Sequence, residues 1–313
     1  MKPQPPSRHD LSSAIVRLQG FIDIVESDAK TKLVDADAVL KSARTAVATL
    51  AEATDHLPTQ ATAGGGDRVK ARVYIQYAMR LEAQPLIAEL KAQPAEFDWT
   101  NGLAFQFYQA ALDGLEIFIG IAGVDPVHEV DSIGSVPAAV LAYLALKHLC
   151  PALVLNAGTC GGFQKEGHRI AEVYVGSKYV AFHHRRSSIP KMREYGIGKY
   201  PVTDSSKLRS TLKLPEGIVS SGDALDYSKE DQEYMNAIGG TLKEMEAAAI
   251  GWVCSALKTP FLPIKTVTDW VDHPADTAQQ FKANYGKAVE ALTKTVVQIL
   301  KYLWAHPEDG VWG

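Results

Sequence analysis

The sequence is poor in cysteine, carries little net charge and has no long apolar run. Its 313 residues include three cysteines, Cys150, Cys160 and Cys254, and none of their spacings resembles a zinc site. We therefore expect reduced thiols in a cytoplasmic protein. The formal net charge of −4 gives no indication of a nucleic-acid partner. No apolar run reaches the roughly eighteen residues of a membrane span, and the first residues lack the apolar core of a signal peptide, so no membrane partner is expected.

Residues 1–67 differ from the rest of the chain in composition and in the spacing of apolar residues. After a polar, proline-rich start, apolar residues repeat at steps of three and four over residues 15–25 and again over 36–50. This spacing predicts two amphipathic helices arranged as a hairpin, followed by a flexible connection in "PTQATAGGGD". Such a hairpin is too small to fold alone, so we expect it to pack on the main domain, residues 68–313, or on a partner subunit.

The main domain alternates predicted strands with predicted helices. "RVYIQYAM", "LEIFIGIAG", "ALVLNAG", "EVYVGSKYVAF", "GIVSSGD" and "PFLPIKTVTD" are typical of strands, whereas "RLEAQPLIAEL", "SVPAAVLAYLALKHLC" and residues 277–304 are typical of helices. "LKEMEAAAIGWV", residues 242–253, has apolar residues at helical spacing and is also predicted to be a helix. The alternation predicts an α/β domain around a mostly parallel or mixed central sheet.

Several polar residues and glycines directly follow the predicted strands. Ligands of α/β sheets bind beyond the carboxyl ends of the strands. We therefore expect three carboxylates and two glycine-bearing loops to converge on one pocket; these residues are Glu82, Gly123, Gly158, Thr159, Asp223 and Asp269.

Each of these signals has a structural alternative. Glu82 could balance the dipole at a helix start, and Asp272 could cap a helix. The glycines of "NAGTCGGF" fit a tight turn as well as a ligand cradle, and they match neither the dinucleotide fingerprint nor the Walker A motif. Glu246 beside an alanine-rich segment is costly to bury unless it binds something. His183 and His184 point to opposite faces of a strand, which argues against a shared metal.

Six motifs taken in order resemble one known family. "AMRLEA", "NAGTCGGF", "FHHRRSSIP", "SSGDALDYS", "LKEMEAAA" and "TVTDWVD" are similar to the 5′-methylthioadenosine/S-adenosylhomocysteine nucleosidases, and most similar to the plant type. The resemblance spans about Arg72 to Trp304 and leaves out the N-terminal hairpin. It implies a nucleoside phosphorylase-like three-layer sandwich with a mixed central sheet, assembled as a homodimer. It also implies hydrolysis of 5′-methylthioadenosine, with S-adenosylhomocysteine as a second possible substrate, to adenine and the 5-thioribose product in methionine salvage, without metal or organic cofactor.

The resemblance also implies roles for individual residues. Glu82 matches the general base that activates water, and Asp269 matches the general acid that protonates adenine at N7. Glu246 matches the acceptor of the ribose 2′- and 3′-hydroxyls, with Met245 against the sugar. The other substrate-binding positions carried over are Thr159, Leu225, Lys243, Glu244 and Thr268.

Two other functions remain open at this point. A phosphorolytic nucleoside phosphorylase would need cationic groups for phosphate, and "PALVLNAGTCGG" has no basic residue. A non-catalytic nucleoside-binding or storage relative would have lost its acid or base, and both are present here. The segments "SSIPKMREYGIG" and "DWVDHPADTAQQF" are candidate walls of the pocket for the 5′ group. The stretch "SIGSVPAAVLAYLAL" fits a dimer interface and a buried core helix equally well.

Overall fold

The computed structural model describes residues 71–313, except residues 227 and 274–275. The predicted N-terminal hairpin lies outside the described residues. Among the residues described, no helix is both long enough and apolar enough to span a membrane.

The described strands form one mixed sheet. Its order is β10-β6-β8-β9-β5-β1-β4-β3-β2, with β7 beside β6. β10 pairs with β5 as well as with β6, so one end of the sheet closes into a ring, while β1, β4, β3 and β2 extend from it as an open sheet. The strands are β1 (Arg72–Tyr77), β2 (Gln93–Ala95), β3 (Gln106–Leu112), β4 (Leu115–Ile121), β5 (Leu153–Gly162), β6 (Val173–Phe182), β7 (Tyr200–Pro201), β8 (Glu216–Ser221), β9 (Leu242–Glu244) and β10 (Phe261–Trp270).

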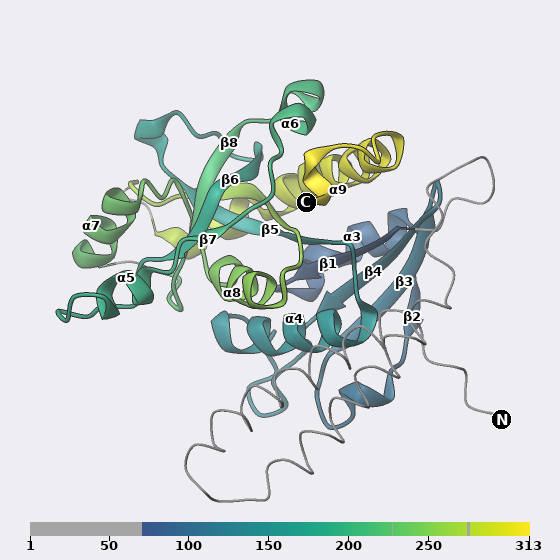
Figure 1. The fold of residues 1–313 in the computed structure, drawn as a ribbon. Coiled ribbons are helices and arrows are strands. Elements are labelled where there is room, and N and C mark those ends of the chain that lie inside the picture. The colour runs from purple at the N-terminus through teal and green to yellow at the C-terminus, as the bar shows by residue number, and fades with distance from the viewer. Residues whose placement is uncertain (1–70, 227, 274–275) are drawn as a thin grey trace, which may run out of the picture. The chain divides into compact units, whose positions relative to one another are not determined.

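Helices cover both faces of this sheet, which confirms the expected three-layer sandwich (Figure 1). One core lies between the sheet and α3, α6 and α9, and the other lies between the sheet and α4 and α8. The helices are α3 (Arg80–Glu89), α4 (Ser135–Leu149), α5 (Met192–Ile197), α6 (Ser206–Leu212), α7 (Lys229–Ile238), α8 (Ala247–Leu257) and α9 (Thr277–Ala305), with short 3₁₀ turns η2 (Asp98–Thr100), η3 (Gln164–Glu166) and η4 (Gly310–Trp312).

The predicted helix over residues 242–253 is wrong in its first part. Leu242 to Glu244 form β9, which pairs with β5 on one side and β8 on the other. The helix α8 begins only at Ala247. Two neighbouring strands offer this segment backbone hydrogen bonds on both sides, and that tertiary pairing overrides the local helical pattern. The consequence is a strand-to-helix junction that places Met245 and Glu246 between the two elements.

The glycine segment also differs from the expectation. It does not follow β5 as a loop but forms the end of the strand itself, through Gly162. A Cβ atom on Gly161 would lie 2.8 Å from Asp269 Oδ2 and 2.7 Å from Val271 Cγ2. Glycine in a strand often marks such a close approach, and here it lets the Asp269 side chain lie against β5.

Candidate active site

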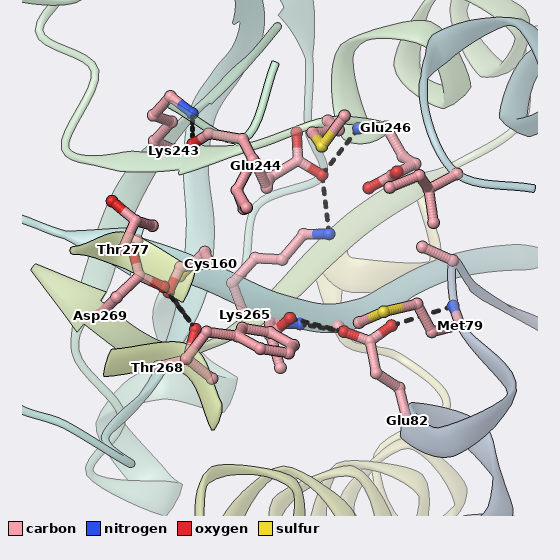
Figure 2. Close-up of a pocket in the computed structure, with 18 of the residues that line it drawn as sticks. Met79, Glu82, Cys160, Lys243, Glu244, Glu246, Lys265, Thr268, Asp269 and Thr277 are labelled. Carbon is pink, nitrogen blue, oxygen red and sulfur yellow. Dashed lines mark hydrogen bonds and ion pairs between the residues drawn. The ribbon is translucent and has the colours of Figure 1, made fainter. Parts of the chain in front are cut away.

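A cavity of about 330 Å³ lies at the carboxyl ends of β1, β5 and β10, and the first turns of α9 and the β9–α8 junction complete its wall (Figure 2). Its volume is that of a small-molecule site. The residues that the family resemblance assigns to catalysis or binding all line this one cavity: Glu82, Thr159, Leu225, Lys243, Glu244, Met245, Glu246, Thr268 and Asp269.

Glu82 is a buried carboxylate at the start of α3. One of its oxygens, Oε1, accepts hydrogen bonds from Thr159 N and Thr159 Oγ1, both at 2.7 Å. The other accepts one from Met79 N at 3.2 Å, so Glu82 also caps its own helix, and it lies in the first turn, where the structural alternative expected a dipole-balancing acid. Burial raises the pKa of Glu82, while these hydrogen bonds and Lys265 oppose the rise. The result is a carboxylate held in one orientation, with a pKa above its usual value.

Asp269 lies near the end of β10, and only 6% of it is exposed. Its Oδ1 accepts a hydrogen bond from Thr268 Oγ1 at 2.7 Å. Burial raises the pKa of Asp269, opposed by this hydrogen bond and by the charge of Lys243. A carboxyl group with so few charge-stabilising donors keeps its proton to higher pH than an exposed aspartate does.

Glu246 occupies the position just before α8. Its Oε1 accepts a hydrogen bond from Gly134 N at 2.8 Å. Burial, followed by the charge of Glu244, raises the pKa of Glu246 to about 8. A carboxylate with so few hydrogen-bond donors from the protein is costly to bury. From the sequence, we expect this cost for Glu246 unless the residue binds a ligand.

Glu244 and Lys265 form an ion pair inside the cavity wall. Lys265 Nζ lies 2.9 Å from Glu244 Oε2, and both side chains are 2% exposed. Glu244 also accepts hydrogen bonds from Glu246 N, Ala247 N and the Ser221 hydroxyl. Burial works against the charge of Lys265, but the nearby carboxylates outweigh it and raise the lysine pKa. The Glu244 carboxylate is therefore bonded to other groups of the protein, and it fixes the start of α8.

The sequence interpretation missed Lys265. The signal was a single lysine inside the apolar strand "PFLPIKTVTD", where a buried cation needs a carboxylate partner. Figure 2 shows Lys265 reaching across the cavity to Glu244. Lys243 is also buried, and its Nζ donates to the carbonyl oxygens of Ala224 and Leu225 at 2.8 and 2.7 Å. It thereby fixes the loop that carries Leu225 at the cavity edge.

Two expected members of the cavity do not line it. Asp223 accepts hydrogen bonds from the backbone and hydroxyl of Ser135, at 2.7 and 2.6 Å, and so holds the start of α4. Gly123 lies away from the cavity lining as well. Asp272 accepts from the backbone N–H groups of Gln164 and Lys165, so it caps η3 as the structural alternative allowed.

The histidine pair has structural partners. The rings of His183 and His184 are 6.2 Å apart, centroid to centroid. His183 Nδ1 lies 2.9 Å from Ser220 Oγ, and burial lowers the pKa of His183 to about 4. Within the described part of the chain, no three His, Cys, Asp or Glu side chains gather in a metal-binding arrangement.

Known proteins share this architecture. The sequence model of the phosphorylase superfamily matches residues 72–301. A 5′-methylthioadenosine nucleosidase of Arabidopsis thaliana is 35% identical over 227 residues, which cover 72% of this chain and 85% of that protein. An Arabidopsis thaliana 5′-methylthioadenosine/S-adenosylhomocysteine nucleosidase is 34% identical, with 72% and 89% covered. A crystal structure of an MTA/SAH nucleosidase has a TM-score of 0.74 at 32% identity and covers 78% of this chain and 99% of that one.

The chain belongs to the phosphorylase superfamily and, within it, to the 5′-methylthioadenosine nucleosidase family. The resemblance seen in the six sequence motifs is therefore confirmed. So is the nucleoside phosphorylase-like fold.

Proposed function

We propose that the protein hydrolyses the N-glycosidic bond of 5′-methylthioadenosine to adenine and 5-methylthioribose, as a step of methionine salvage. One observation carries the proposal: a single cavity holds Glu82 and Asp269, two buried carboxyl groups with contrasting partners. Paired carboxyl groups in unlike environments are the usual means of obtaining a base and an acid at one pH. The names of the most similar relatives support the same reaction.

Glu82 is the general base in this proposal. Two donors from Thr159, one from Met79 and the charge of Lys265 favour its ionised form, while burial keeps its pKa high enough to accept a proton. It takes a proton from water as the water oxygen bonds to the anomeric carbon of the ribose. The bond from that carbon to the adenine nitrogen breaks, and its electron pair leaves with the base.

Asp269 is the general acid. Burial holds its proton, and the Thr268 hydroxyl fixes the orientation of the carboxyl group. Donation of that proton to N7 of adenine neutralises the leaving base. The water proton then resides on Glu82 and the acid proton on adenine, so the two carboxyl groups exchange protonation states over one turnover.

Glu246 binds the ribose. Its Oε1 is held by Gly134, and within the described residues its Oε2 has no hydrogen-bond partner, which leaves Oε2 for sugar hydroxyls. Met245, beside it at the strand-to-helix junction, packs against the sugar ring. A carboxylate at this place stabilises the positive charge that develops on the ribose as the glycosidic bond breaks.

The charges that line the cavity favour water over phosphate as the nucleophile. Glu82, whose donors favour its ionised form, and Glu244, which is paired with Lys265, both line the cavity, and their negative charge would repel phosphate. Lys265 and Lys243, which are buried in the cavity wall, already have partners: Lys265 pairs with Glu244, and Lys243 donates to backbone carbonyls. Phosphate would need several such donors to itself.

The apolar part of the cavity suits a methylthio group. Val271, Ala278 and Phe281, from the segment "DWVDHPADTAQQF", line it, whereas no residue of "SSIPKMREYGIG" does. We assign the latter segment to the cavity of a partner subunit in a homodimer. 5′-Methylthioadenosine is then the preferred substrate, and S-adenosylhomocysteine a slower one.

We place the protein in the cytoplasm. Cys150, Cys160 and Cys254 are all free, as expected of a chain in a reducing compartment. Cell fractionation with an antibody to the protein tests this assignment, and recovery in an organelle or membrane fraction would contradict it.

The reaction is tested by incubating the protein with 5′-methylthioadenosine in phosphate-free buffer and measuring free adenine. Glu82→Gln and Asp269→Asn keep the size of each side chain and remove its acid–base function, so each should lower kcat by about 10²–10⁴-fold. Glu290→Gln, at an exposed position on α9, serves as control. Adenine release only after phosphate is added would make the protein a phosphorylase. Ligand binding without adenine release in either buffer would make it a non-catalytic relative.

A further inference from the structure

The end of β10 carries a β-bulge beside Asp269. Val267 lies opposite Cys160 of β5. The next residue of β5, Gly161, lies opposite Asp269, so Thr268 is an extra residue of β10. Because neighbouring residues of a strand point to opposite faces, the bulge places Asp269 on the face opposite Val267. In a regular strand both side chains would share the face of Val267, which is packed in the core. The bulge therefore turns the Asp269 side chain to the cavity.

Beyond the bulge, one edge of β10 has no neighbouring strand within the described residues. On that edge β6 pairs with β10 only from Ile264 to Thr266. On the other edge Val271 N donates to Gly162 O of β5, so the N–H and C=O of Trp270 point away from β5. Backbone groups that are shielded from water need a hydrogen-bond partner, and those of Trp270 must find one outside the sheet.

Two amide side chains of α9 take the place of the missing strand. Gln280 Oε1 accepts from Trp270 N at 3.1 Å, and Gln280 Nε2 donates to Trp270 O at 3.5 Å. Asn284 Nδ2 donates to Thr268 O at 2.9 Å. Gln280 and Asn284 are four residues apart and so lie on one face of α9. That face fixes the backbone on both sides of Asp269.

The helix that carries these amides is firmly supported. From Ala288 onward, α9 buries a run of residues in the core. Its first turns line the active-site cavity through Ala278, Phe281 and Lys282, but neither Gln280 nor Asn284 lines it. Rigid elements hold site residues more precisely than loops do. The two amides can therefore act on the reaction only through the strand that they hold.

We propose that Gln280 and Asn284 are positioning residues of the general acid, whose amides hold the bulge of β10 and so aim the Asp269 carboxyl group at the leaving base. This inference rests on the proposed function, in which Asp269 protonates adenine. The hydrogen bond that orients Asp269 comes from Thr268, which itself belongs to the bulge. Proton donation requires hydrogen-bond reach between the carboxyl group and the base, and a misplacement of about 1 Å can lower the rate by about 10²-fold.

A double-mutant cycle tests the proposal. Gln280→Met and Asn284→Leu remove the amides and keep the approximate size of each side chain. Each is made in the parent protein and in Asp269→Asn. We measure the single-turnover rate of adenine release, which isolates the chemical step, and KM for 5′-methylthioadenosine. In the parent, each substitution should lower the rate about ten- to hundredfold with KM unchanged. In Asp269→Asn, where no acid remains to be aimed, the same substitutions should change the residual rate less than about twofold.

Gln279→Met is the matched control, because Gln279 is an exposed neighbour of Gln280 on the same turn. It should keep the parental rate. Circular dichroism and Tm check that every variant is folded at the assay temperature. If Asn284→Leu does not fold, Asn284→Ala, which removes the same donor and suits a helix, replaces it.

Equal rate losses in the parent and in Asp269→Asn would overturn the inference, because a general loss of structure acts in both backgrounds. Parental rates in both test variants, a raised KM with an unchanged rate, or an equal loss in Gln279→Met would also overturn it. Each of these results leaves the hydrolase intact. If the parent releases no adenine, or if Asp269→Asn keeps the parental rate, the proposed function or its acid is wrong, and this inference fails with it.

Discussion

Four carboxyl groups share one cavity, and the protein gives each of them different partners. Glu244 is held by Lys265 and by backbone amides, and Glu82 by three hydrogen bonds. Asp269 has one hydroxyl donor, and Glu246 has one backbone N–H. Since like charges so close in a buried site repel, these partners decide which groups ionise first. The carboxyl groups that the reaction requires therefore lower the stability of the folded protein.

Glu246 should reveal that cost directly. Its folded-state pKa of about 8 lies above the ordinary carboxyl value, so the folded state binds more protons than the unfolded state between about pH 4.5 and pH 8. The stability that Glu246 contributes is present below this window and is lost as pH rises through it. Glu246→Gln should flatten this loss and raise Tm at pH 8 by a few degrees relative to the parent, since about 1 kcal/mol moves Tm by about 2–4 °C in a chain of this class.

The same substitution should lower kcat/KM by about 10²–10³-fold, because a neutral amide binds the ribose hydroxyls less well than a carboxylate and stabilises less the positive charge that develops on the ribose ring. Thermal unfolding at pH 5 and pH 8, with adenine release measured on the same samples, checks both effects. Unchanged activity would remove Glu246 from the ribose site. An equal Tm shift at the two pH values would contradict its raised pKa.

At the scale of elements, the junction of β9 and α8 organises the cavity. β9 is three residues long, and Glu244, its last residue, accepts hydrogen bonds from the first amides of α8. The same carboxylate pairs with Lys265 from β10. One side chain thus joins a strand, a helix and a distant strand, and it sets where Met245 and Glu246 lie.

Glu244→Gln should therefore destabilise the protein by about 3–5 kcal/mol, because it leaves the buried Lys265 charge without its counter-ion. Urea unfolding measures this effect. Glu290→Gln, which breaks only the exposed pair with Lys294, should stay within about 0.5 kcal/mol of the parent. Full stability with weakened substrate binding would show instead that Glu244 contacts the ligand, as the family resemblance implies.

At the scale of the molecule, α4 is a core helix, and the other role that its sequence left open, a dimer interface, stays a prediction for its outer face. Its inner face, with Ala138, Leu141 and Ala142, is buried in the core. Its outer face exposes Val136 and Tyr143 at 72% and 49%, together with Val140. Large apolar side chains in one stripe at helical spacing are typical of a protein–protein interface.

This stripe is our candidate for the homodimer contact. Val136→Glu with Val140→Glu should convert a dimer into a folded monomer, because two buried charges without partners cost more than the apolar contact returns. Size-exclusion chromatography with light scattering measures the mass, and circular dichroism checks the fold. Leu103→Glu, at an exposed apolar residue in the loop before β3, is the control. A dimer that survives the double substitution would move the interface to another surface.

Long, strongly patterned segments were predicted well from the sequence. "PFLPIKTVTD" forms β10, and residues 277–304 form α9 with one residue added at its end. β3 was not predicted, and β9 was taken for a helix. Short strands such as β9 depend on pairing with distant partners, and three residues carry too little periodicity to reveal that pairing.

The sequence by itself determined the residue types and the alternation of elements that give an α/β sheet, because periodicity depends on neighbouring residues. It also supplied the carboxylates at strand ends. Only the tertiary structure decided the partners that lie far apart in the chain: Thr159 and Glu82 are separated by 77 positions, and Gly134 and Glu246 by 112. Asp223 and Asp269 both follow strands, yet one holds a helix start and the other lines the cavity. That difference is set by the packing of whole elements, which no local pattern encodes.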